Sequence, residues 1–202
     1  MDKGRKRPSE VLTPDEIKRI LAQTSRRNTG GIRDRALIVL LWRCGLRISE
    51  ALDLKPDDLD LEGGFIKIEH GKGDKRGIVA IDGFAIGLLR PWLDRREEIP
   101  NLPEDAPVFC SFAQPCPGHR LGAPQIRDRL KLLAKRAGIA KRVHPHGFRH
   151  TMATELAREG VPMRVIQAQL RHENLLTTER YIARLMPGEG LAALHDREPV
   201  DF

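Results

Sequence analysis

The sequence predicts an α+β domain that is mainly α-helical and carries one small antiparallel β-hairpin. Two patterns predict this class. Apolar residues recur at helical spacing along most of the chain, whereas residues 65–81 alternate with period two around a glycine-rich segment. The chain has 202 residues, of which 40% are hydrophobic and 31% charged, so it can build and cover one core. This composition excludes a disordered polyelectrolyte and a membrane protein.

The charge, the apolar segments and the cysteine content of the chain indicate which partner and which cellular location to expect. Lys and Arg outnumber Asp and Glu by 35 to 28, so the net charge is +7, which favours a polyanionic partner such as nucleic acid. The longest apolar run has seven residues (36–42), far fewer than the roughly 18 to 20 that span a bilayer. No apolar stretch follows the basic N-terminus, so no secretory signal is expected. Three sparse cysteines argue against a disulfide scaffold or a structural zinc site, and a cytoplasmic location is expected.

Residues 1–12 read as a flexible basic arm, and helices follow it. Thr13 and Glu16 form a capping box with Pro14 between them, which predicts the start of a helix. A second helix is expected over about 33–44, apolar nearly all round and therefore central, with Gly45 ending it in a left-handed cap. A short helical turn is expected at 48–54.

The remaining elements are one hairpin and several helices. Strands around 65–68 and 78–81 flank a basic glycine-rich tip, and a helix starts near Asp82. A short edge strand is expected at 108–112, and an amphipathic helix with a basic exposed face at 123–137. Three C-terminal helices are expected, at about 147–159, 162–171 and 175–185.

The basic residues that could contact DNA are Lys75, Arg76, Arg127, Arg129, Lys131 and Lys135, although a solvated surface explains the same charges.

A set of polar residues stands out along the chain. Tyr181 is the only tyrosine, and His172 precedes it by nine residues. Each member of the set has a structural explanation on its own, as a packing residue, a core histidine, a turn residue or a surface charge. The other members are His146, Arg149 and His150 in HPHGFRHT, Arg47 in GLRISEAL, and Lys72 in GKG.

Together these side chains could cleave a phosphodiester without a metal or a nucleotide cofactor. Guanidinium groups such as those of Arg47 and Arg149 can bind the non-bridging oxygens and stabilise the transition state. A phenol such as that of Tyr181 can attack phosphorus if neighbouring groups transfer the protons. His146, His172 and Lys72 have the chemistry for those transfers. The sequence has no acidic triad for magnesium, no phosphate-binding GxxxxGK[ST] loop and no zinc-ligand spacing, so no cofactor is expected.

On the motifs GLRISEAL, GKGDKRGIVAI, HPHGFRHTMAT, LRHEN and TTERYIA, the chain resembles the catalytic domain of tyrosine recombinases, or phage integrases. The resemblance extends from about Thr13 to Leu185. It implies that the fold is that of this DNA breaking-rejoining domain. It also implies a nucleophile, Tyr181, that forms a 3′-phosphotyrosyl bond. The catalytic set that it implies is Arg47, Lys72, His146, Arg149, His172 and Tyr181.

Two neighbours of this set are expected to support it. Glu50 occupies a position where the family often has an acid that buttresses the site, and a charge on the helix surface is the alternative. His150 is expected beside the site, with simple core packing as the alternative. The sequence departs from the family at Arg171, where many relatives have glycine, and at Phe148, where leucine is usual.

The expected organisation is a basic arm (1–12), a catalytic domain (13–186) and a tail (187–202). The tail could dock on a neighbouring protomer or pack in cis. Most family members carry an N-terminal DNA-binding domain of about 100 residues, which we expect to be absent here.

The expected function is site-specific recombination of double-stranded DNA by a tetramer, with no membrane partner. The alternatives are a DNA-binding accessory protein of the same fold that does not exchange strands, and nicking and religation like that of type IB topoisomerases.

Overall fold

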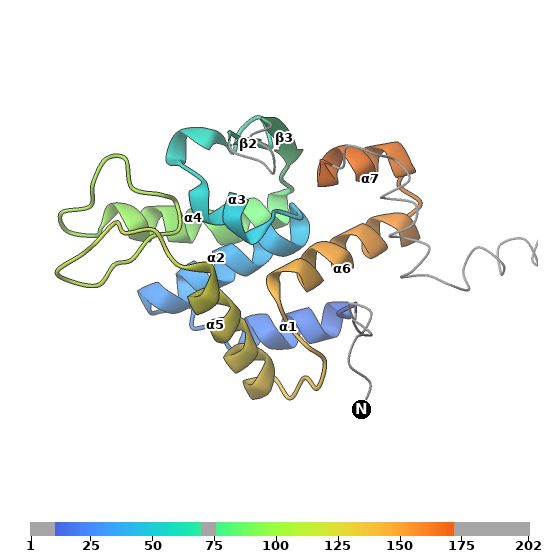
Figure 1. The fold of residues 1–202 in the computed structure, drawn as a ribbon, viewed down its shortest axis with the longest axis horizontal. Coiled ribbons are helices and arrows are strands. Elements are labelled where there is room, and N and C mark those ends of the chain that lie inside the picture. Colours follow the sequence, from blue (N-terminus) through green and yellow to red (C-terminus); the bar gives the residue numbers. More distant parts are fainter. Residues whose placement is uncertain (1–10, 70–75, 172–202) are drawn as a thin grey trace, which may run out of the picture.

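The computed structural model describes residues 11–69 and 76–171, and it confirms the predicted class. Within these residues, one small antiparallel sheet lies at the edge of a group of α-helices (Figure 1). The helices are α1 (Pro14–Ala22), α2 (Thr29–Arg43), α3 (Ile48–Asp53), α4 (Gly83–Glu97), α5 (Ala123–Arg136), α6 (Pro145–Arg158) and α7 (Met163–Leu170), with a short 3₁₀ helix at Pro56–Asp58.

Helix α2 is the centre of the fold. Its residues from Ala36 to Trp42 are all buried, as expected of a segment that is apolar on every side. α2 packs most extensively against α4 and α6, and Figure 1 shows these helices on either side of it. The end of α2 therefore lies deep in the molecule, where the next turn of the chain meets α6 and α7.

The sheet has three strands rather than the predicted two. Strands β2 (Phe65–Ile68) and β3 (Gly77–Ala80) form the expected hairpin, and Ile66 and Val79 pair on its buried face. The extra strand β1 (Leu59–Asp60) pairs with β2 but is only two residues long, too short for a periodic signal. The far edge of β3 is covered by α7, because the Gln169 amide bonds the backbone N–H and C=O of Ala80, both at 2.9 Å.

Two predicted helix starts and one predicted strand were wrong, and hydrogen bonds explain each difference. α2 begins at Thr29 instead of about 33, because the Asn28 side chain accepts a bond of 2.7 Å from the Gly31 N–H. α6 begins at Pro145 rather than 147, since His144 caps it. The predicted edge strand at 108–112 is reduced to an isolated bridge between Cys110 and Arg120.

Hydrogen bonds that belong to no sheet hold the segment around Val108 in place. The Val108 N–H donates to the Leu54 carbonyl at 2.7 Å, and the Val108 carbonyl accepts from the Trp92 indole at 2.9 Å. Because these bonds use both backbone groups of Val108, this residue does not pair with a strand. The third predicted C-terminal helix (175–185) and the arm lie outside the described residues.

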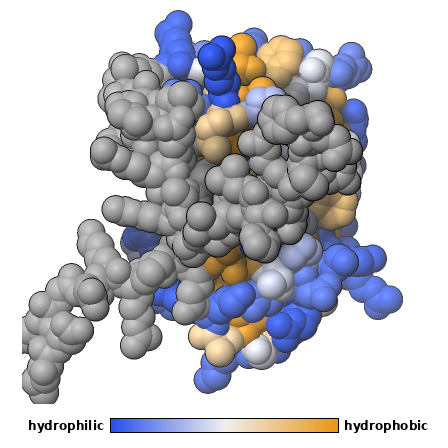
Figure 2. All heavy atoms as spheres, turned by 90° about the vertical axis from the view of Figure 1, so that its right-hand side faces the viewer, coloured by the Kyte–Doolittle hydropathy of each residue, from blue (hydrophilic) through white to orange (hydrophobic). Residues whose placement is uncertain are grey.

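Figure 2 shows the side that lies on the right of Figure 1, and the described residues visible there include both hydrophilic ones and patches of apolar ones. Exposed apolar residues in the described part of the chain include Ile78 and Val165. Among the described residues, no helix is both long and apolar enough to cross a membrane.

The glycine after α2 should be indispensable to this architecture. Gly45 has φ +63°, and a Cβ there would lie 2.1 Å from the Met152 methyl group, so Gly45→Ala should destabilise the fold by about 1 to 3 kcal/mol. Gly87→Ala is the matched control, because its Cβ would meet nothing within 4 Å on an exposed face of α4. It should raise stability by up to about 1 kcal/mol. Thermal unfolding of both variants gives the comparison, and equal shifts of the same sign would contradict this role of Gly45.

Candidate active site

The turn between α2 and α3 places Arg47 beside Glu50. Arg47 is the N-cap of α3, and its backbone N–H donates to the Glu50 carboxylate at 2.8 Å. The same carboxylate accepts from the Arg47 guanidinium at 2.6 Å through its other oxygen. The side chain of Glu50 is 1% exposed and that of Arg47 is 29% exposed, so the acid is buried and the guanidinium reaches solvent. The Glu50 carboxylate therefore lies against Arg47, as a supporting acid at this position would.

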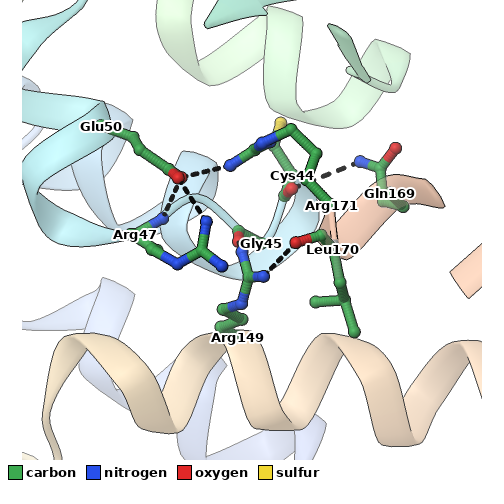
Figure 3. A network of polar contacts seen from close by, with 8 residues as sticks. All are labelled: Cys44, Gly45, Arg47, Glu50, Arg149, Gln169, Leu170 and Arg171. Atoms are coloured by element: carbon green, nitrogen blue, oxygen red, sulfur yellow. Dashed lines mark hydrogen bonds and ion pairs between the residues drawn. The ribbon is translucent and has the colours of Figure 1, made fainter. Parts of the chain in front are cut away.

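Arg149 lies on α6 and is 1% exposed. Its guanidinium donates to the carbonyl of Gly45, just beyond the end of α2, and to the carbonyl of Leu170, the last residue of α7 (Figure 3). Carbonyls at helix C-termini lack partners within the helix and carry partial negative charge. Two such ends therefore compensate the buried cation.

His146 and His150 lie one turn apart on α6, and their rings meet edge to face with centroids 4.3 Å apart. His146 is exposed, whereas His150 is buried. The His144 ring lies 6.4 Å from that of His146, and its Nδ1 accepts from the Gly147 N–H at 3.2 Å. His144 therefore fixes the first turn of the helix that presents His146.

Arg171 is a further member of this group. It ends α7 in the left-handed region, with φ 50° and ψ 49°, a conformation that costs a non-glycine residue roughly 1 to 2 kcal/mol. Its side chain is 12% exposed, and Nη2 donates to the Glu50 carboxylate. One buried carboxylate therefore pairs with two arginines from distant parts of the chain, as Figure 3 shows.

The charges of this group shift the pKa values of its acid and its histidine. Burial alone would raise the pKa of Glu50, but the charge of Arg171 and hydrogen bonds from Arg47 and Arg171 outweigh it and hold that pKa below the usual value. Desolvation, followed by the charges of Arg149, His144 and Arg47, lowers the pKa of His146. At neutral pH, Glu50 is thus an anion and His146 a neutral imidazole, which can accept a proton.

Of the predicted catalytic set, the structure brings together Arg47, His146 and Arg149, with Glu50 and His150 beside them. Lys72, His172 and Tyr181 lie outside the described residues. No group of three or more His, Cys, Asp or Glu side chains suited to a metal occurs in the described parts of the chain.

The predicted DNA-contacting residues differ in their partners. Arg129 is committed to the buried Asp34 at 2.5 Å, which gives it a structural role that the charge pattern on α5 does not reveal. Lys131 pairs with Asp128 at 2.8 Å and Arg76 with Glu69 at 2.9 Å, and both cations remain solvent-accessible. Arg127 and Lys135 are exposed on α5, and Lys75 lies outside the described residues.

Sequence reasoning missed two contributors to the site, Arg171 and His144. The signal for Arg171 was its occupation of a position where many relatives have glycine. The signal for His144 was its place directly before Pro145, because proline favours the first helical position and the residue before it is then the N-cap.

Comparison with known proteins shows which proteins this chain is similar to. The chain is 36% identical over 164 residues to the tyrosine recombinase XerC of Chromobacterium violaceum, covering 81% of this chain and 52% of that protein. It is also 36% identical over 172 residues to the tyrosine recombinase XerA of Thermococcus kodakarensis, covering 85% of this chain and 57% of that one. The chain thus spans little more than half the length of these relatives.

Solved structures show the same fold. The crystal structure of XerA recombinase matches with a TM-score of 0.79 at 30% identity, over 97% of this chain and 68% of that one. A post-cleavage complex of the XerH site-specific recombinase with its palindromic difH substrate matches with a TM-score of 0.74 at 28% identity, over 94% and 54% of the two chains. The model of the phage integrase family matches residues 10–186, and on this match the chain belongs to that family.

Proposed function

We propose that this chain cleaves and rejoins double-stranded DNA as a site-specific recombinase, through a covalent 3′-phosphotyrosyl intermediate on Tyr181. The observation that carries the proposal is the convergence of Arg47, His146 and Arg149 around the turn between α2 and α3. Two segments far apart in sequence, the turn before α3 and the first turns of α6, supply two guanidiniums and a neutral imidazole to one place. The names of the relatives, which are tyrosine recombinases, support the same activity.

In the proposed reaction the Tyr181 phenol oxygen attacks the scissile phosphorus, and its proton passes to a histidine, His146 or His172. The bond to the 5′-oxygen breaks, and Lys72 protonates that oxygen as it leaves. Arg47 and Arg149 stabilise the negative charge that builds on the non-bridging oxygens. Attack by a 5′-hydroxyl on the phosphotyrosine then reverses these steps and releases Tyr181. The energy of the phosphodiester is conserved in the bond to Tyr181, so ATP is not required, and the arginines rather than a metal stabilise the transition state.

The partner in this proposal is duplex DNA bound by a homotetramer in the cytoplasm. The catalytic unit would be residues 13–186, flanked by the basic arm (1–12) and the tail (187–202). Exposed basic residues such as Arg127 and Lys135 would contribute phosphate contacts, which makes binding salt-dependent. The XerH complex with its substrate supports DNA as the partner.

The first prediction concerns the covalent intermediate. The chain, incubated with nicked duplexes from DNA flanking its own gene, should form an adduct on the peptide that contains Tyr181, because the nick lets the cleaved fragment leave. Tyr181→Phe should abolish the adduct and leave DNA affinity nearly unchanged. Mass spectrometry and a gel-shift titration measure the two quantities.

The outcomes of this assay separate the proposal from its alternatives. An adduct that survives Tyr181→Phe would contradict the assignment of the nucleophile. DNA binding without an adduct, also in a longer chain with any preceding domain, would favour the accessory protein. Relaxation of supercoiled plasmid without exchange between sites would favour topoisomerase-like activity.

A second prediction concerns the shape of the Arg149 side chain. Arg149→Lys keeps the charge but cannot bond the Gly45 and Leu170 carbonyls together as a planar fork does, so single-turnover cleavage should fall by about a hundredfold or more. Arg90→Lys, at an exposed position on α4, is the control and should cleave at the wild-type rate. Cleavage by the Arg149→Lys variant within a few-fold of wild type would remove Arg149 from the site.

A third prediction follows from the charge of Glu50. Its pKa in the folded chain lies below the ordinary value of 4.5, so its charge stabilises the fold above about pH 4.5, and this contribution is lost as the pH falls through the folded-state pKa. Glu50→Gln should therefore cost about 3 kcal/mol of unfolding free energy at neutral pH, and less in acid.

Urea unfolding at about pH 7 and pH 4 measures this difference. The exposed Glu97→Gln on α4 serves as the control, with little effect at either pH. A deficit in Glu50→Gln that stays constant between the two pH values would refute the assigned charge of Glu50.

A further inference from the structure

We propose that Arg171 is a positioning residue of the cleavage site. By pairing with Glu50 it adds positive charge beside the scissile phosphate, and it leaves Arg47 with guanidinium N–H groups for that phosphate. This inference rests on the proposed function and deepens it, because it adds a third guanidinium to the two that the catalytic set contains.

The contacts of Arg171 point inward to the site. Its side chain is 12% exposed, and Nη2 bonds a carboxylate that is itself 1% exposed. Nη1 is fully buried and has no hydrogen-bond acceptor among the described residues. A buried guanidinium nitrogen without an acceptor leaves the Arg171 charge poorly compensated, so the charge of a phosphate bound nearby would stabilise it without direct contact.

The backbone accommodates this side chain at two places. Arg171 adopts the left-handed conformation that glycine adopts most easily, yet it carries a long side chain that passes Gly77, the first residue of β3. A Cβ on Gly77 would lie 2.6 Å from the Arg171 Cδ, and the three nearest atoms to it all belong to Arg171. The absence of a side chain at Gly77 thus lets Arg171 pass to Glu50.

The charge of the site supports the same role. Among the described residues of the site, Arg47, Arg149 and Arg171 carry three positive charges against the carboxylate of Glu50. With glycine at position 171, one fewer cation would face a phosphate that gains negative charge as the attacking oxygen adds. Glu50 would also have to be neutralised by Arg47 alone. Sharing Glu50 with Arg171 therefore leaves more of the Arg47 charge for the substrate.

The test compares scissile phosphates with and without a negative charge. In single-turnover cleavage at saturating enzyme, Arg171→Met should lose about tenfold or more on a phosphodiester, and much less on a methylphosphonate, which carries one negative charge fewer in the ground state and in the transition state. Arg171→Lys should restore most of the rate. DNA affinity, measured separately by gel shift, should change by less than about threefold. Arg164→Met, which removes an exposed cation from the same helix, is the matched control.

Substitution of Gly77 gives an independent test of the position of the Arg171 side chain. Gly77→Ala should lower the cleavage rate in the wild-type background, because the new methyl group displaces the Arg171 side chain. The same change should have no effect in an Arg171→Gly background, because the crowding atoms are then gone. Equal losses in both backgrounds would contradict the placement of Arg171.

The remaining outcomes distinguish this inference from the proposed function. Cleavage by Arg171→Met at the wild-type rate, or an equal loss on the charged and the uncharged phosphate, would overturn the role of Arg171 and leave the proposed function intact. Failure of the wild-type chain to form an adduct would instead contradict the proposed function, and the inference would fall with it.

Discussion

The site depends on the burial of one guanidinium, that of Arg149, at the point where two helices end. Removing this cation from water is expensive, and the cost is offset because the carbonyls of Gly45 and Leu170 both point at it. Those carbonyls can reach Arg149 only if α2, α6 and α7 meet at one place. Gly45 favours the meeting, since its φ of +63° strains any other residue and a Cβ there would displace the Met152 methyl group on α6.

A second constraint is the single buried carboxylate in this cluster. Glu50 closes the first turn of α3 by bonding the Arg47 N–H, and the same group compensates the guanidiniums of Arg47 and Arg171. The Glu50 side chain therefore both caps α3 and neutralises part of the positive charge of the site. Because Glu50 stays ionised, both arginines keep fixed positions in the absence of DNA, and electrostatic stabilisation works best with groups that need no reorganisation.

Several elements were predictable because their signals are local. The Thr13–Glu16 box, the apolar α2 segment and the period-two hairpin each have a signal that is carried by residues adjacent in sequence. The failures have the opposite origin. Strand β1 exists because β2 lies beside it, and the segment near Val108 is drawn to Leu54, more than fifty residues earlier in the chain. The commitment of Arg129 to Asp34 likewise joins two helices that no local pattern connects.

The sequence by itself determined the fold class, the polarity of each helix face and the residue types that a phosphodiester-cleaving site needs, because these follow from periodicity and side-chain chemistry. Only the tertiary structure decided how the arginines are compensated. Arg47, Arg149 and Arg171 have the same chemistry along the chain, but one bonds two helix ends while the other two share Glu50. The Arg47–Glu50 pair is local, but Arg149 and Arg171 bond groups about 20 to 120 residues away, and such partners are selected by packing geometry, which no local pattern encodes.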